Sequence, residues 1–148
     1  MKKFIVLFML IVVFGAFPAF SVDSNNPNVQ EKIQNMDPNV YLEIKETINE
    51  IQKNNPYVSA NITNLESEFK EGNLKISEIV EKSYVQSLII DILQYSDVRA
   101  QIHDLIQKQD VKDLINNLMQ DEDIQKASSE LMNNKKINKY VNMIINDE

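Results

Sequence analysis

The chain has 148 residues, of which 15 are Lys or Arg and 22 are Asp or Glu, so its formal net charge is -7. It contains no Cys or Trp, two Gly and one His. These counts exclude a disulfide framework, a thiolate zinc site, a cysteine nucleophile and a glycine-rich phosphate loop. The acidic balance also argues against nucleic acid as a partner, because phosphate binding requires a basic face.

Residues 1–21 have the pattern of an export signal. Lys2 and Lys3 form a basic start, an apolar run over residues 4–14 follows, and small residues lead to Ser21. About 11 apolar residues are too few to cross a bilayer as a helix, which takes roughly 20. We therefore expect cleavage after Ser21 and a secreted chain, extracellular or periplasmic, without stable membrane insertion.

The remaining part, residues 22–148, is predicted to form a single all-α domain. Loss of the two leader lysines leaves 13 cationic against 22 anionic side chains, a net charge of -9. Gly72 becomes the only glycine, and β-hairpins depend on glycine-containing turns. Glu, Gln, Lys and Leu are frequent and favour helices. A chain of about 127 residues is long enough to bury a packed core.

Three Asn-Pro or Asp-Pro pairs predict helix starts in the first half of the domain. The polar side chain can cap free backbone N–H groups, and proline suits the first helical position. The pairs begin at Asn26, Asp37 and Asn55. We expect a short helix after the first pair and a longer one over residues 38 to about 53 after the second.

Capping-box spacing predicts two further starts, because Thr63 and Ser83 each stand three residues before Glu or Gln. A helix over about 63–71 would end at Gly72, a residue suited to a helix C-terminus. Another helix is expected to begin near residue 74. The first of these regions also holds an N-glycosylation acceptor, Asn61-Ile62-Thr63, which matters only if the source is eukaryotic.

The segment 84–148 divides into five blocks of 13 residues, and the second, ninth and tenth positions of every block are apolar. These positions are Val85, Ile92, Leu93, Val98, Leu105, Ile106, Val111, Leu118, Met119, Ile124, Leu131, Met132, Ile137, Ile144 and Ile145. Thirteen residues of one straight helix rotate about 140° short of four turns, so these positions would not form a stripe. The pattern therefore predicts five tandem short helices, packed successively into a compact or superhelical array.

The expected joints between blocks carry acidic residues. Asp97, Asp110 and Asp123 open three of the blocks, where a carboxylate can cap a helix and meet the positive end of its dipole. Ser128 departs from the apolar sixth position of the other blocks. We interpret it as a looser contact or a pocket wall.

A ligand cavity in such an array would draw its walls from the ninth and tenth positions of adjacent blocks. The candidates are Leu105, Ile106, Leu118, Met119, Leu131 and Met132. Such a cavity would enclose several hundred Å³. The alternative is that these six side chains are simply core.

No catalytic or metal-binding constellation is recognisable, and no cofactor is expected. His103 falls at a block position predicted to face solvent and has no identifiable nucleophile as a partner. The cluster Asp121-Glu122-Asp123 lacks the alternating ligands and glycine of a calcium loop. We interpret it as a helix end followed by a capping Asp. The chain is therefore predicted not to be an enzyme.

Blocks such as DVRAQIHDLIQKQDVKDLINNLMQ resemble the short-helix repeats of co-chaperones, a resemblance that implies binding of apolar client segments. The cysteine-free, exported, helical character is similar to insect allergen repeats and nematode fatty-acid-binding and retinol-binding proteins, which implies enclosure of lipid. The near absence of glycine departs from the allergen repeats. Two hypotheses follow: an exported protein that binds a protein partner, and a carrier of fatty acids or other small apolar ligands.

Overall fold

The computed structural model describes residues 26–33, 37–70 and 72–146. The predicted leader and its cleavage site lie outside these residues. The described chain forms nine α-helices and no strand, which confirms the predicted all-α class. The helices are α3 (Pro27–Ile33), α4 (Pro38–Asn54), α5 (Pro56–Lys70), α6 (Ile76–Val80), α7 (Ser83–Leu93), α8 (Ser96–Ile106), α9 (Gln109–Leu118), α10 (Glu122–Met132) and α11 (Lys135–Ile145). Among them, none has the length and apolar character needed to cross a membrane.

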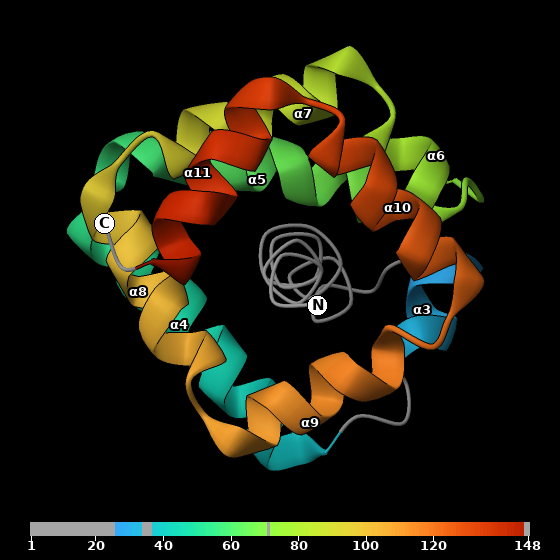
Figure 1. Cartoon of the computed structure of the whole chain (residues 1–148), viewed down its shortest axis with the longest axis horizontal. Helices are drawn as coiled ribbons and strands as arrows, with labels where there is room; N and C mark the ends of the chain where they lie inside the picture. Colours follow the sequence, from blue (N-terminus) through green and yellow to red (C-terminus); the bar gives the residue numbers. More distant parts are fainter. Residues whose placement is uncertain (1–25, 34–36, 71, 147–148) are drawn as a thin grey trace.

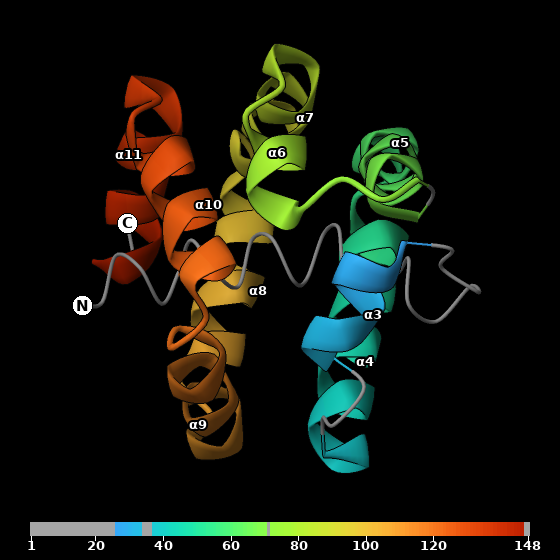
Figure 2. The ribbon, with the colours of Figure 1, turned by 90° about the vertical axis from the view of Figure 1, so that its right-hand side faces the viewer.

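The helices follow one another around a ring and climb as they do so, which makes the array superhelical (Figure 1). Seen from the side, α3 to α5 form one end, α6 to α8 the middle, and α9 to α11 the other end (Figure 2). Helices of successive turns pack on each other: α4 contacts α8 and α9, α5 contacts α7, α6 contacts α10, and α11 contacts α7 and α8. Each turn therefore buries one side of the turn before it.

The predicted 13-residue repeat is present as five helices of nearly equal length. They begin at Ser83, Ser96, Gln109, Glu122 and Lys135, which are spaced by 13 residues. Isolated helices of 10 or 11 residues are marginal in water. Their stability must therefore come from packing between turns of the superhelix.

One extended residue turns the chain before each repeat helix. These residues are Lys82, Tyr95, Lys108, Asp121 and Asn134, all with negative φ and with ψ between 116° and 132°. Any L-residue can adopt this conformation. The joints consequently need no glycine, and in the described chain Gly72 is the one glycine with a positive φ, at 86°.

The acidic residues that open the blocks are not the N-caps of their helices, contrary to the prediction. Asp97, Asp110 and Asp123 lie inside the first turn, because each helix begins one residue before them. They can still interact with the helix dipole there. Side-chain caps are instead supplied by Asp121, which accepts from the amides of Asp123 and Ile124, and by Asn134, which accepts from those of Lys136 and Ile137.

The repeat extends one block further towards the N-terminus than the sequence pattern suggested. Ile76, Ile79 and Val80 in the short helix α6 occupy the sixth, ninth and tenth positions of a block that would begin at residue 71, and all three are fully buried. The second position of that block is Gly72. The pattern of apolar positions is therefore incomplete in this block, because α6 begins only at the sixth position.

Burial follows the repeat position closely. The second and sixth positions are buried in all five blocks, including Ser128 at 0% exposure, whose hydroxyl lies 4.0 Å from the sulfur of Met119. The tenth position is only partly buried in the last three blocks, at Met119, Met132 and Ile145. The core is therefore built from the second and sixth positions and from the ninth in every block except the third, where Leu118 is partly buried. The tenth position is core in the first two blocks and forms the border in the last three.

The Pro-containing starts are confirmed; of the two capping-box starts, the one at Thr63 is wrong and the one at Ser83 is right to within one residue. α3, α4 and α5 begin at the prolines that follow Asn26, Asp37 and Asn55. Thr63 lies in the middle of α5, and Ser83 is the first residue of α7, after Lys82 as N-cap. A cap signal inside a strongly helical segment carries little weight when a proline start precedes it. Asn61 also lies within α5, and its glycosylation stays a prediction.

Candidate binding grooves

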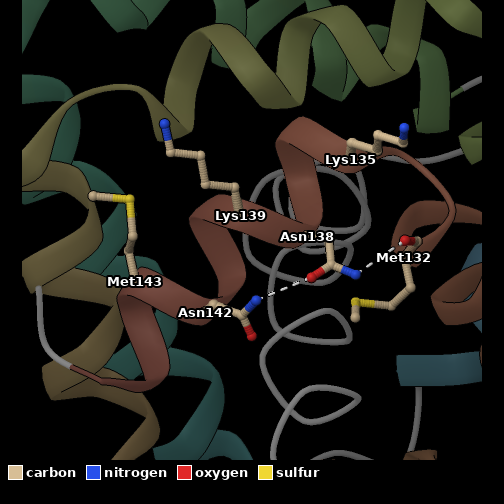
Figure 3. A pocket seen from close by; sticks show the side chains of 6 residues that line it. All are labelled: Met132, Lys135, Asn138, Lys139, Asn142 and Met143. Carbon is tan, nitrogen blue, oxygen red and sulfur yellow. Dashed lines mark hydrogen bonds between the residues drawn. The ribbon is translucent and has the colours of Figure 1, made fainter.

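A groove formed by described residues runs along α11, with a volume of about 590 Å³. We name it the α11 groove. It is lined by Met132, Lys135, Asn138, Lys139, Asn142 and Met143. Figure 3 shows these side chains along one side of α11, with Met132 reaching in from the end of α10. Because α11 is the last described helix, no later turn of the superhelix packs on this side, as earlier turns do elsewhere.

Asparagine side chains form a hydrogen-bonded row in the α11 groove. Asn142 Nδ2 donates to Asn138 Oδ1 at 3.0 Å, and Asn138 Nδ2 donates to the carbonyl oxygen of Met132 at 3.3 Å (Figure 3). The row fixes the orientation of the Asn138 amide. Each amide still has hydrogen-bonding capacity beyond these two bonds. The two methionines beside the row are flexible, polarisable side chains that adapt to varied ligand shapes.

The charge of α11 differs from that of the rest of the molecule. Lys135, Lys136 and Lys139 lie on this helix, and it has no acidic residue, whereas every other described helix has at least one. The three lysines are exposed and form no ion pair with a described residue. The α11 groove is thus a cationic strip on a chain whose net charge is -7.

The six residues proposed as cavity walls lie mostly in the core. Leu105, Ile106 and Leu131 are between 0% and 6% exposed, whereas Leu118, Met119 and Met132 are partly buried and pack against the core cluster. Met132 lines the α11 groove. Whether the others bind a ligand stays a prediction.

His103 is not the exposed side chain that its block position predicted. It is half-buried, and its Nδ1 lies 2.7 Å from the carbonyl oxygen of Ile144 in the last turn of α11. A carbonyl can only accept, so Nδ1 carries the hydrogen. The prediction failed because it treated each helix alone, whereas α11 packs on α8 one turn further along the superhelix.

The acidic cluster at the start of α10 stabilises two helix N-termini. Asp121 caps α10, whereas the sequence predicted that the block-opening Asp123 would be the cap. The carboxylate of Asp123 reaches α6, where it accepts hydrogen bonds from the amides of Ile76 at 3.0 Å and Ser77 at 3.3 Å and from the Ser77 hydroxyl. A groove of about 460 Å³ passes beside the cluster. Within the described ranges, no group of three or more acidic or histidine side chains is arranged to hold a metal ion.

Glu43 on α4 carries a perturbed carboxyl group. Its Oε2 atom is buried and accepts no hydrogen bond from the described part of the chain. Burial, and then the nearby Asp110 carboxylate at the start of α9, raise the pKa of Glu43 above its ordinary value. Two carboxyl groups meet here between successive turns. We interpret the pair as a contact that makes the stability of the fold depend on pH.

Comparison with known proteins yields no relative: the chain matches no protein-family model, no curated protein and no solved structure.

Proposed function

We propose that the chain is an exported, non-enzymatic protein that binds a protein partner, and that the α11 groove holds an acidic segment of that partner. The observation that carries the proposal is the unpaired cationic strip of α11 on an otherwise acidic molecule. Lysines at a groove attract an acidic segment during encounter and disfavour other partners. The asparagine row can donate to carboxylate or backbone oxygens of a segment lying along the helix.

The repeat architecture supports this assignment. Superhelical arrays of short helices present extended surfaces that are held rigid by packing between turns. Here the second and sixth repeat positions are buried in every block, which fixes α11 on α7 and α8. A rigid groove lowers the entropy cost of binding, because the side chains around it are already ordered.

The alternative, a carrier of fatty acids, has weaker support. The α11 groove and the pocket beside Arg99 mix charged or polar lining residues with apolar ones, and the groove beside Asp123 is lined by polar and charged residues alone. A lipid cavity would be lined predominantly by apolar side chains. The Met132 and Met143 side chains in the α11 groove are the feature that the alternative can use.

The test measures binding of an acidic, amphipathic peptide labelled with a fluorophore to the chain purified after export from an expression host. We expect saturable binding that weakens at high salt, and at least tenfold weaker binding for the double variant Lys135→Glu and Lys139→Glu. The matched control reverses the exposed Lys45 and Lys53 on α4 and makes the same change in net charge. Equal weakening by both pairs would contradict a specific groove.

Two further measurements separate the competing functions. A fluorescent fatty acid that binds and is displaced by oleate, with no peptide binding, would favour the carrier. Turnover of any member of a broad panel of hydrolase substrates would contradict the non-enzymatic assignment. Mass spectrometry of the exported chain tests the leader, because cleavage after Ser21 predicts a first residue of Val22.

A further inference from the structure

The only arginine in the sequence, Arg99, is buried without a carboxylate partner. It lies in the first half of α8 and is 7% exposed. Its Nη1 donates to the carbonyl oxygen of Leu93 at 2.7 Å, and its guanidinium lies 5.4 Å from the centre of the Tyr140 ring. Nε is buried with no hydrogen-bond partner. No acidic side chain of the described chain forms an ion pair with it.

A buried guanidinium with no counter-charge is energetically costly. Taking a cation out of water costs several kcal/mol unless an anion and hydrogen-bond acceptors replace the water. The single carbonyl and the Tyr140 ring offset this cost only in part. The planar guanidinium of arginine can pair with both oxygens of a carboxylate, which the ammonium group of lysine cannot do. A buried arginine in this position therefore suggests that the site recognises a planar acceptor such as a carboxylate.

A pocket adjoins Arg99 at the contact between α8 and α11. Its volume is about 250 Å³, and it is lined by Ser96, Asp97, Arg99, Ala100, His103, Met143 and Ile144. The His103 ring is held in place through Nδ1, and its Nε2 has no partner among the described residues. Ser96 adds a hydroxyl at the first residue of α8. Arginine, imidazole and hydroxyl groups thus converge on a space the size of a small organic acid.

We propose that this pocket binds a carboxylate group, with Arg99 as its principal partner and His103 and Ser96 as further polar contacts. The exposed Asp97 carboxylate at the rim favours a ligand that carries one carboxylate over a polyanion. The carboxylate can belong to a free small acid or to a polypeptide, and Arg99 would bind it in the same way in both cases. This inference rests on the pocket itself and does not depend on the proposed function of the α11 groove, although Met143 lines both.

The sequence offers unusually direct reporters for a test by nuclear magnetic resonance. His103 is the only histidine and Arg99 the only arginine, so the imidazole and guanidinium signals need no assignment. We expect sodium acetate and sodium butyrate to shift both sets of signals saturably, and sodium chloride at the same ionic strength to leave them unchanged. An acidic peptide with a free C-terminal carboxylate, compared with its amidated form, tests the polypeptide source. Binding of the small acids or of the peptide with a free C-terminus supports the site, and the tighter binder of the two shows which kind of molecule supplies the carboxylate.

Two variants make the result specific. Arg99→Gln should weaken acetate binding at least tenfold, because the charged partner is lost. That change also removes the bond to Leu93, so Ala100→Leu serves as the second variant: Ala100 is exposed at the pocket and leucine favours a helix. We expect Ala100→Leu to abolish the shifts at His103 and its control Ala60→Leu, on the exposed face of α5, to retain them. Shifts that match those from chloride, or that persist unchanged in Ala100→Leu, would overturn the proposal.

Discussion

Substitution of Asp123 tests how the turns of the superhelix are joined. The carboxylate on α10 accepts from two backbone amides and one hydroxyl at the start of α6, 46 and 47 residues earlier in the chain. In Asp123→Ala these donors lose their acceptor. Ile76 is 0% and Ser77 1% exposed, so water can replace the carboxylate only from the groove that Asp123 lines.

The size of the effect follows from the cost of unsatisfied donors. A buried donor left without a partner costs about 1–3 kcal/mol, and loss of an ordinary helix cap costs about 1 kcal/mol. Allowing for relaxation of the short helix α6, we expect Asp123→Ala to lower the free energy of unfolding by about 3 kcal/mol. For a chain of this size that corresponds to a fall in Tm of about 10 °C. Asp123→Asn keeps one acceptor oxygen, so its free energy of unfolding should lie between those of Asp123→Ala and the wild type.

Urea unfolding followed by circular dichroism provides the assay, and Asp97→Ala provides the matched control. Asp97 occupies the same block position as Asp123 but is exposed and caps no other helix in the described structure. Its replacement should cost only the interaction with the dipole of α8, about 0.3–1 kcal/mol. If Asp123→Ala destabilises the chain no more than Asp97→Ala does, the contact between α6 and α10 does not act as described.

Three further predictions concern stability. Burial and Asp110 raise the pKa of Glu43 in the folded chain. The stability that Glu43 contributes is therefore present below its unfolded pKa and lost as the pH rises through its folded pKa. Glu43→Gln should be more stable than wild type at pH 7 but not at pH 4, which urea unfolding at both pH values would show. Gly72→Ala meets no atom within 4 Å but must adopt φ 86°, so we expect a loss of about 1 kcal/mol, and Gly72→Asn should lose less in the same unfolding assay. Ile115→Ala, at a fully buried sixth position, should cost about 2–5 kcal/mol, whereas Met119→Ala at a partly buried tenth position should cost about half as much; equal losses would contradict the assignment of core and border.

The helical class and the 13-residue period could be predicted from the sequence because both depend on local pattern. Proline fixes the start of α5 at Pro56. In the 13-residue blocks, the second and sixth positions recur at the spacing of one helix face and are separated by polar residues. The 13-residue pattern does not reveal α6, because the second position of its block is Gly72 and only Ile76, Ile79 and Val80 are in register. This shortened block has too few apolar positions for the 13-residue repeat to be recognised.

The functional residues depended on contacts between turns, which no local pattern contains. Arg99 gave no signal beyond being the only arginine, yet its burial against Tyr140 is what marks the pocket. His103 was assigned to solvent because its own helix leaves it exposed, and α11 then covers it. The lack of acidic residues in residues 135–145 is visible in the sequence.

The most direct test of the binding assignment is an amide chemical-shift map of the exported chain titrated with the acidic, amphipathic peptide. The account predicts that the largest shifts fall within Lys135–Ile145 and at Met132, where the cationic groove lies. Shifts should be small on α4 and α5 at the far end of the superhelix (Figure 2). Saturable peptide binding with its largest shifts on α4 and α5, or no shifts at all on α11, would contradict the account.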